Sequence, residues 1–441
     1  MAGQYTVRVV DESHVAPPPG SVSTTTIPLT FLDVSWIFCC PIQRIFFYEF
    51  HRPTLHFTQN IFPHLKQSLS LTLRHFFPFA ANLSCSPPPN NPCILYREGD
   101  SVSVTIAESD ADFNHLTASH ARDNTEFKCL VPTLPMASFS SDTTHVVPIM
   151  AMQFTVFPNS GISIGITFNH VAADGKSFNH FMKSWAAMHR SEKGSSLSLP
   201  FHNKDMIKDP EGLVSTYMKD WWNWKILGAT EEVPVDTVRI TNDADQPGAA
   251  QLHISTFVVT CAFMWVNLIK LQDSSKSNGH LHDDTVYHFV PVADCRDRFE
   301  FPVPATYFGN CLAFLFLTAK RSDLIGKNGI VFAAKAIGRQ ICELEKGPLV
   351  GAEKWVLNLI KVVEAGRVVS VAGSPKLRVY DTDFGWGRPK KSEVVHIGAN
   401  GAFSLAECRD EDGAIEVGIV IGRDKIDGFN VIFKQALNLN F

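Results

Sequence analysis

The chain has 441 residues, of which 45% are hydrophobic and 19% are charged, a balance that is typical of a folded globular protein and excludes a disordered chain. This length exceeds the size at which one hydrophobic core usually stops growing, so we predict two domains. A formal net charge of -5 at pH 7 excludes the basic surface that a nucleic-acid partner would require.

The N-terminus carries Arg8, Asp11 and Glu12 where a secretory signal would have its apolar segment. The longest uncharged stretch, residues 143–173, is interrupted by proline, glycine and polar residues, so we predict no membrane span. The 10 cysteines form no CxxC pair, and this spacing favours reduced thiols over a zinc or thioredoxin-like site. These features predict a cytoplasmic protein without a metal site.

Strands are predicted before the first helix. Residues 7–20 indicate a short strand and a Pro/Gly turn, and residues 23–34 indicate an extended run rich in β-branched residues. Between Phe57 and Phe79, apolar residues recur at spacings of three and four. This period predicts a helix with one buried face that ends near Pro78.

Two pairs of strands are predicted next. Residues 93–99 and 101–109 alternate with a period of two, which predicts a half-buried antiparallel pair. Residues 149–170 predict two strands joined at a Pro/Gly turn, and residues 177–191 have the apolar spacing of a helix. His170 is therefore predicted to lie where a strand ends.

The polar, Gly/Ser/Pro-containing residues 192–220 predict a long connection between domains. The second half repeats the mixture of element types, so the predicted class is mixed α/β. Its predicted strands are residues 285–294, 311–320, 377–384 and 415–421, and its predicted helix is residues 332–346. The predicted units are an N-terminal domain of residues 1–191, a crossover linker of residues 192–220 and a C-terminal domain of residues 221–441.

A histidine and an aspartate lie four residues apart in the segment HVAADG, at the predicted junction of a strand and a helix. His170 could present its imidazole to a cleft, and a pKa near neutrality suits a base that deprotonates a hydroxyl. Asp174 could pair inward to lock the loop, and Gly175 allows a tight turn. Taken alone, a His–Asp pair more often indicates a structural hydrogen bond or a solvated turn.

A second motif, DFGWG, covers residues 383–387. Two glycines, Gly385 and Gly387, bracket Trp386, which predicts a tight loop that holds the indole in place. The alternative interpretation is an ordinary turn with a buried aromatic side chain.

Together, HxxxD and DFGWG resemble the signatures of the plant BAHD acyltransferase family. The resemblance extends over nearly the whole chain, and YFGNC and AGSPKL followed by DFGWGRP are similar to the branch that acylates sugars of anthocyanins, flavonoids and other phenolic glucosides. The further matching segments are TIPLTFLDVSW (26–36), VADCRDR (292–298), YFGNC (307–311) and SVAGSPKLRVY (370–380).

This resemblance implies a fold like that of chloramphenicol acetyltransferase, with two α/β domains, mixed sheets and a solvent channel between them. It implies an acyl-CoA co-substrate, malonyl-CoA preferred, with no permanently bound cofactor, a phenolic or flavonoid glycoside acceptor, and a monomer. His170 would remove a proton from a sugar hydroxyl, which attacks the thioester directly in a ternary complex. Asp174 and Asp383 would be structural supports, with Arg296 as the partner of Asp174.

The resemblance also implies a set of binding residues. An oxyanion or coenzyme role is expected for Ser374 and its neighbours. A malonyl carboxylate would need a cation, whereas a hydroxycinnamoyl donor (coumaroyl or caffeoyl) would need an aromatic pocket and stays an alternative. The residues expected to contact substrate or coenzyme A are Gly175, Asn310, Gly373, Ser374, Gly385 and Trp386, and the candidate malonyl cations are Lys176, Lys376, Arg378 and Arg388.

Two further interpretations stay open. Residues 239–255 are shorter than the corresponding segment of the family, in which relatives usually carry another strand and a helix. The chain could therefore be a ligand-binding relative without activity, or the loss could be harmless. Residues 161–165 read GISIG, a literal GxSxG, which marks a nucleophilic serine in serine hydrolases. The β-branched run continues beyond Ser163, so we predict that this serine lies within a strand.

Overall fold

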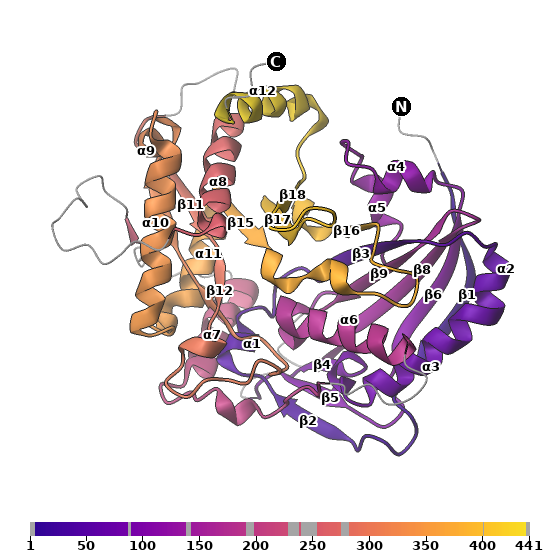
Figure 1. Cartoon of the computed structure of the whole chain (residues 1–441). Helices are drawn as coiled ribbons and strands as arrows, with labels where there is room; N and C mark the ends of the chain where they lie inside the picture. The colour runs from indigo at the N-terminus through magenta and orange to yellow at the C-terminus, as the bar shows by residue number, and fades with distance from the viewer. Residues whose placement is uncertain are drawn as a thin grey trace.

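The computed structural model describes residues 5–86, 90–137, 143–190, 198–227, 238–239, 254–274, 282–399 and 401–437. Within these ranges, the strands form two six-stranded sheets, one four-stranded sheet and one two-stranded sheet. Figure 1 shows the two large sheets side by side, the first built mainly from the N-terminal half and the second from the C-terminal half. The predicted mixed α/β class is confirmed.

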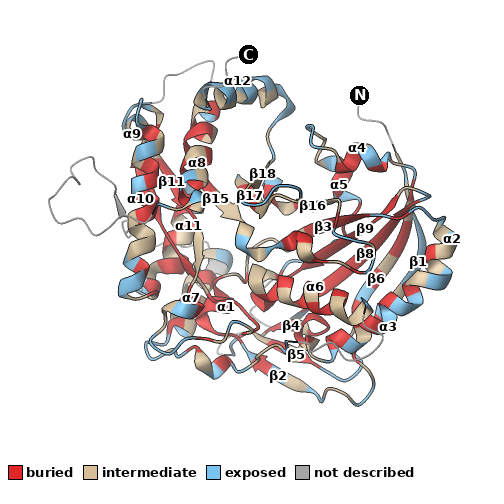
Figure 2. Cartoon of the chain, in the orientation of Figure 1, coloured by how far each residue is buried: buried red, intermediate tan, exposed pale blue. Residues whose placement is uncertain are grey.

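The first six-stranded sheet is covered on both faces at its centre. Every residue of its strands β8 and β9 is buried, as the red strands in Figure 2 show. Helices α3 (Phe62–Leu73) and α6 (Gly175–Arg190) pack on one face, and side chains of α4 (Phe113–Thr117) and α5 (Thr125–Lys128) pack on the other. From edge to edge its strands are β1 (Val7–Val15), β6 (Val102–Ser109), β8 (Met150–Phe157), β9 (Gly161–Phe168), β3 (Ile42–Glu49) and β16 (Lys391–Val394).

The sixth strand of this sheet comes from the second half of the chain. β16 runs antiparallel to β3, with Val394 opposite Arg44. On its other side β3 is antiparallel to β9, with Ile42 opposite Phe168. β16, which follows the DFGWG motif, is therefore separated from β9 only by β3. β9 ends at Phe168, two residues before His170.

The second six-stranded sheet carries a layer of helices. Helix α8 (Thr256–Ser274) packs against α10 (Gly329–Glu343) and α12 (Ile426–Ala436), and α11 (Trp355–Ala365) packs against β15. From edge to edge the strands are β10 (Val238–Arg239), β14 (Leu317–Lys320), β11 (Val286–Val290), β15 (Val368–Ala372), β17 (Ala402–Glu407) and β18 (Ile415–Ile419).

The remaining elements connect and flank these two layers. Helix α7 (Leu213–Trp222), which packs against both α1 and α11, begins within the predicted connection 192–220 and ends two residues beyond it. The four-stranded sheet comprises β2 (Thr25–Pro28), β5 (Cys93–Tyr96), β4 (Asn82–Cys85) and β7 (His145–Pro148); the two-stranded sheet comprises β12 (Val292–Asp294) and β13 (Leu312–Phe314); the short helices are α1 (Phe31–Val34), α2 (Thr54–His56) and α9 (Arg321–Ile325).

The structure differs from the extended run predicted over residues 23–34, because Phe31–Val34 forms helix α1. Thr30 and Asp33 form a capping box, in which the Thr30 side chain accepts a hydrogen bond from the Asp33 N–H and the Asp33 carboxylate accepts one from the Thr30 N–H. These bonds satisfy N–H groups at the helix start. The capping hydrogen bonds stabilise a helix here despite the β-propensity of the segment.

The predicted pairing of residues 93–99 with residues 101–109 is wrong. Both segments form strands, but β5 pairs with β2 and β4, whereas β6 pairs with β1 and β8 in a different sheet. The two-residue alternation reports that each strand has a buried face. It carries no information on which strand is the partner.

Two other element predictions need correction. The helix predicted to end near Pro78 ends at Leu73. The strand predicted over residues 377–384 is absent: Pro375–Leu377 and Val379–Asp381 form two short 3₁₀ turns. Between them Arg378 adopts a left-handed conformation with φ 51°, which a continuous strand does not permit. The predicted strands at 285–294, 311–320 and 415–421 are confirmed, with interruptions.

All ten cysteines are free thiols. Among the described residues, no helix is both long and apolar enough to cross a membrane. In the same part of the chain, no group of three or more His, Cys, Asp or Glu side chains is arranged to hold a metal ion.

Candidate active site

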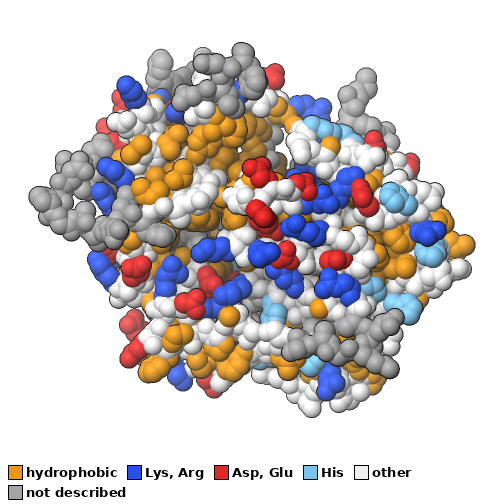
Figure 3. Space-filling view, viewed as in Figure 1, with side chains coloured by type: hydrophobic (Ala, Val, Ile, Leu, Met, Phe, Trp, Pro, Cys, Tyr) orange, Lys and Arg blue, Asp and Glu red, His pale blue; other side chains and the backbone are white. Residues whose placement is uncertain are grey.

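A cavity of about 2090 Å³ is lined by residues from both halves of the chain, including Trp36 and His170 from the first and Ser374 and Arg388 from the second. Typical small-molecule pockets occupy roughly 300–1,000 Å³, so this cavity has room for two substrates at once. On the face shown in Figure 3, acidic and basic side chains gather together over the middle of the molecule.

His170 lies directly after β9, in a 3₁₀ turn over His170–Ala172, and it lines the cavity. Its Nδ1 atom lies 3.1 Å from Oδ1 of Asn310. The indole of Trp36 stacks on the imidazole with ring centroids 3.9 Å apart and an interplanar angle of 7°. These two contacts fix both the position and the tilt of the ring.

The amide of Asn310 determines which nitrogen of His170 carries the proton. Its Nδ2 faces three acceptors, the Asp33 carboxylate at 3.1 Å and the backbone oxygens of His170 at 2.9 Å and Val171 at 3.3 Å. An amide nitrogen only donates, so the amide oxygen must face His170. Because that oxygen only accepts, Nδ1 of the neutral imidazole is the protonated nitrogen, and Nε2 is left as the free base.

Asp33 anchors this arrangement. Its side chain is 0% exposed, pairs with Nζ of Lys204 at 3.0 Å and accepts the backbone N–H of Asn310 at 2.9 Å. Pairing and hydrogen bonds offset the cost of burying the carboxylate. Sequence reasoning did not single out Asp33 or Lys204 as site residues; the Thr-x-x-Asp spacing of the helix cap was the one signal available.

The pKa of His170 is lowered from its ordinary value of 6.5, chiefly because burial disfavours the charged imidazolium. The backbone carbonyl of His170, the charge of Asp174, the hydrogen bond with Asn310 and the charge of Asp33 act in the opposite direction. The balance keeps the imidazole neutral near pH 7, the state in which it can accept a proton.

Asp174 pairs with Arg296, whose Nη2 lies 2.8 Å from Oδ2, in a site where both side chains are at most 1% exposed. The carboxylate also accepts the backbone N–H groups of Ser177 at 2.9 Å and Cys311 at 3.1 Å. Arg296 reaches Asp294 as well, at 3.0 Å. This buried network joins the start of α6 to the strands β12 and β13.

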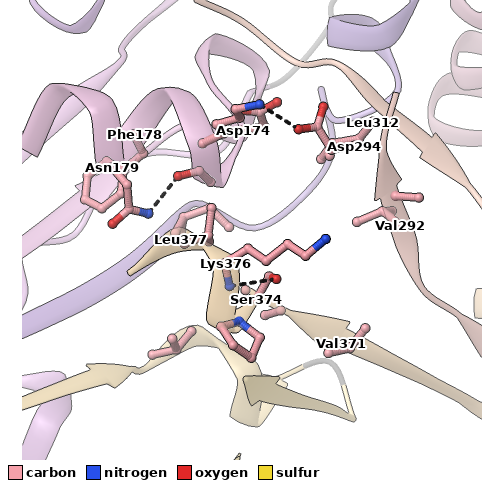
Figure 4. Close-up of a pocket in the computed structure, with 18 of the residues that line it drawn as sticks. Asp174, Phe178, Asn179, Val292, Asp294, Leu312, Val371, Ser374, Lys376 and Leu377 are labelled. Carbon is pink, nitrogen blue, oxygen red and sulfur yellow. Dashed lines mark hydrogen bonds and ion pairs between the residues drawn. The ribbon is translucent and has the colours of Figure 1, made fainter. Parts of the chain in front are cut away.

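Gly175, Gly373 and Ser374 all line the cavity. Gly373 has φ +78°, and a Cβ atom there would lie 2.7 Å from the backbone oxygen of Leu405, so only glycine fits. Figure 4 shows Ser374 on the wall across from Asp174, with its hydroxyl accepting the N–H of Lys376 at 3.3 Å.

The DFGWG loop lies behind the cavity wall. Oδ1 of Asp383 accepts the N–H groups of Gly385 at 2.7 Å and Gly387 at 2.9 Å, which closes the loop on itself. Trp386 packs edge-on against Tyr48 of β3, with ring centroids 5.5 Å apart. In the described part of the chain, these loop residues are not among those that line the cavity, so contact of Gly385 or Trp386 with substrate stays a prediction.

The four candidate malonyl cations all line the cavity, but three of them are already paired. Lys176 lies 3.0 Å from Asp294, and Arg378 and Arg388 lie 2.7 Å and 4.0 Å from Asp381. Lys376 forms no ion pair with any described residue, and in Figure 4 its side chain extends into the cavity.

Two sequence features fall elsewhere. Ser163 of the GxSxG match lies in the middle of β9 and is 0% exposed, whereas a serine nucleophile requires a sharp turn between a strand and a helix. Residues 240–253 of the shortened segment lie outside the described residues.

Comparison with known structures identifies the fold. Vinorine synthase superposes with a TM-score of 0.64 at 18% identity and covers 98% of both chains. TRI101 of F. sporotrichioides, complexed with coenzyme A and T-2, gives 0.61 at 13% identity over 92% of this chain and 97% of that one. The fold is thus the two-domain α/β fold of these proteins, as the resemblance to the BAHD family implied.

The Transferase family model matches residues 6–435, so the chain belongs to this family, the BAHD acyl-CoA-dependent acyltransferases. It is 37% identical to coumaroyl-CoA:anthocyanidin 3-O-glucoside-6''-O-coumaroyltransferase 1 of Arabidopsis thaliana, over 98% of this chain and 97% of that one. It is 34% identical, with the same coverage, to malonyl-coenzyme A:anthocyanin 3-O-glucoside-6''-O-malonyltransferase of Dahlia pinnata.

Proposed function

We propose that this enzyme transfers an acyl group from acyl-CoA to a sugar hydroxyl of a phenolic or flavonoid glycoside, with His170 as the general base. The observation that carries the mechanism is the hydrogen bond between His170 Nδ1 and Asn310 Oδ1 at 3.1 Å, which leaves Nε2 as the proton acceptor. The acceptor class rests on relatives that act on anthocyanin glucosides and cover nearly the whole chain.

In the proposed reaction, a sugar hydroxyl donates its hydrogen bond to Nε2 of His170. The imidazole takes the proton as the hydroxyl oxygen attacks the thioester carbonyl, and the C–S bond then breaks as the proton passes to the leaving coenzyme A sulfur. Neither the chain nor a cofactor needs to carry the acyl group. Because the cavity can hold both substrates, binding supplies the proximity that this direct transfer requires.

We assign supporting roles to the buried network and the DFGWG loop. Asp174 and Arg296 hold the turn that carries His170 against the second half of the chain, through their contacts at the start of α6. Asp383 closes its own loop against β3. Gly373 and Ser374, on the opposite wall, are placed to contact the thioester or the pantetheine arm.

Malonyl-CoA is our first candidate donor. A malonyl carboxylate requires a cation that is not already paired, and Lys376 meets this requirement among the four predicted candidates. Its ammonium group extends into the cavity beside Ser374, where a short dicarboxylic acyl group would lie.

A hydroxycinnamoyl donor is the second candidate, and a different observation favours it. Trp36, Phe38 and Phe314 form an aromatic wall in the cavity, with Trp36 stacked on both His170 and Phe314 at 3.9 and 4.9 Å. Planar aromatic acyl groups stack well on such surfaces. The 37% identity to a coumaroyltransferase supports the same choice.

The experiment is a competition between donors. Purified enzyme is incubated with anthocyanin, flavonoid and simple phenolic glucosides, together with equimolar malonyl, acetyl and coumaroyl coenzyme A, and products are identified by mass. Malonylated glucosides would support the first candidate, and Lys376→Met should then raise KM for malonyl-CoA about 10-fold while leaving acetyl-CoA unchanged. Coumaroylated products would assign the second. If calorimetry shows coenzyme A binding but no donor reacts, the chain binds the ligand without turnover.

A further inference from the structure

Arg44 is a buried cation in the cavity wall that the mechanism does not use. The residue is 6% exposed, and its Nε donates to Oγ of Ser392 at 3.1 Å. Within the described residues, no carboxylate lies within 4.0 Å of its guanidinium, and no acceptor is found for its two Nη nitrogens. A charge buried in this way is costly unless a ligand or water completes its hydrogen bonds.

Glu407, the last residue of β17, lines the same cavity. Its Oε1 accepts the backbone N–H of Tyr380 at 2.7 Å. Its Oε2 is buried and has no hydrogen-bond partner among the described residues. Arg44 therefore offers unused donors, and Glu407 offers an unused acceptor, on one cavity wall.

A chain of hydrogen bonds through Ser392 and Tyr380 connects these two side chains. The hydroxyl of Tyr380 accepts the N–H of Ser392 at 3.3 Å, and Ser392 in turn accepts from Arg44. Tyr380 donates its own N–H to Glu407. Burial lowers the pKa of Arg44 to about 10, and the charge of Glu407 acts in the opposite direction, as expected of neighbouring opposite charges.

This pair borders the catalytic base. On β3, Arg44 follows Ile42 by two residues and so lies on the same face of the sheet, and Ile42 is opposite Phe168, two residues before His170. His396, just after β16, also lines the cavity. Its Nδ1 lies 3.2 Å from the backbone nitrogen of Gln43, the residue before Arg44 on β3, and its pKa is lowered to about 4, chiefly by burial.

We infer that Arg44 and Glu407 form a subsite that binds hydroxyl groups of the acceptor sugar next to the hydroxyl that reacts. A sugar hydroxyl both accepts and donates hydrogen bonds, so it can accept from an Nη of Arg44 and donate to Oε2 of Glu407. A donor carboxylate fits less well, because Glu407 would repel it. This inference rests on the proposed function and names the side chains that recognise its acceptor.

The test compares Glu407→Gln and Arg44→Lys with the wild type. Glu407→Gln keeps an acceptor for the Tyr380 N–H but replaces the free acceptor by a donor, and Arg44→Lys keeps the charge but loses the fork of donors. Each variant should raise KM for the glucoside about 10-fold or more and leave KM for acyl-CoA within about twofold. Glu411→Gln, at an exposed carboxylate elsewhere in the cavity lining, is the matched control and should change neither constant.

Glucosides that lack a single sugar hydroxyl provide the second measurement. If the subsite binds one of the hydroxyls, the corresponding deoxyglucoside should have a raised KM with the wild type and no further increase with Glu407→Gln. An unchanged glucoside KM in both variants, or a raised KM for acyl-CoA instead, would overturn the inference and leave the proposed function intact. A wild-type enzyme that acylates only alcohols without sugar would overturn both.

Discussion

Removing the carboxylate of Asp174 should destabilise the protein strongly, because Arg296 has 0% side-chain exposure and loses its only buried counter-charge among the described residues. In Asp174→Ala, the N–H groups of Ser177 and Cys311 also lose their acceptor. Breaking a buried ion pair by removing one partner costs about 3–5 kcal/mol. Lower soluble yield and a lower urea midpoint of unfolding are the expected results.

Asp294→Ala is the matched control for this prediction. Asp294 pairs with the same guanidinium at 3.0 Å, but its side chain is 40% exposed, so its loss should cost no more than about 1 kcal/mol. Urea unfolding followed by tryptophan fluorescence compares both variants with the wild type. An Asp174→Ala protein as stable as the wild type, or equal losses in the two variants, would refute the assignment of Asp174 as a structural support.

Three other predictions concern His170, Asn310 and Ser163. Since the pKa of His170 is lowered by burial, kcat/KM should rise with pH only below about 6.5 and stay level above it; a rise that continues to pH 8 would contradict this. Asn310→Ala should reduce kcat of the folded protein roughly 10- to 100-fold, because the proton on Nδ1 loses its acceptor, and an unchanged kcat would contradict the assignment of the tautomer. Ser163→Ala should keep kcat within about twofold, since that hydroxyl is buried in β9; complete loss of activity in a folded variant would restore the serine hydrolase interpretation.

Acid stability depends on His396, which also lines the cavity. The pKa of His396 is lowered from 6.5 to about 4, chiefly by burial, so between these values the unfolded chain binds more protons than the folded one. Stability should therefore be lost as pH falls from 6.5 towards 4, and His396→Gln should reduce that slope. Equal slopes in both proteins, measured by urea unfolding at pH 5 and 6.5, would contradict the pKa shift.

The sequence predicted those parts of the fold that depend on local patterns. The apolar runs in residues 149–170 predicted two strands, which are confirmed as β8 and β9. The spacing of three and four in residues 177–191 predicted a helix, which is confirmed as α6. Pairing between distant segments leaves no such local trace. This is why the partner of β5 was predicted wrongly, and why the crossover of β16 onto β3 was not predicted at all.

The same distinction applies to the site. His170 and Asp174 share one short motif, so spacing alone marked them as candidates. Arg44 and Glu407 reach the cavity only after folding, from two separate segments, and each is an ordinary charged residue in its local sequence. Their burial and unused hydrogen-bonding atoms are properties of the folded chain, which composition and periodicity do not report.

The most direct test of the central claim compares acyl transfer by the wild type and by His170→Ala. Each protein is incubated with acyl-CoA and a phenolic glucoside, and acylated glucoside is measured by mass, with urea unfolding as the control for the fold. We expect the wild type to form acylated glucoside. His170→Ala should form it about 10²- to 10⁴-fold more slowly, at unchanged stability. Full activity in His170→Ala would show that another group removes the proton, and the mechanism proposed here would be wrong.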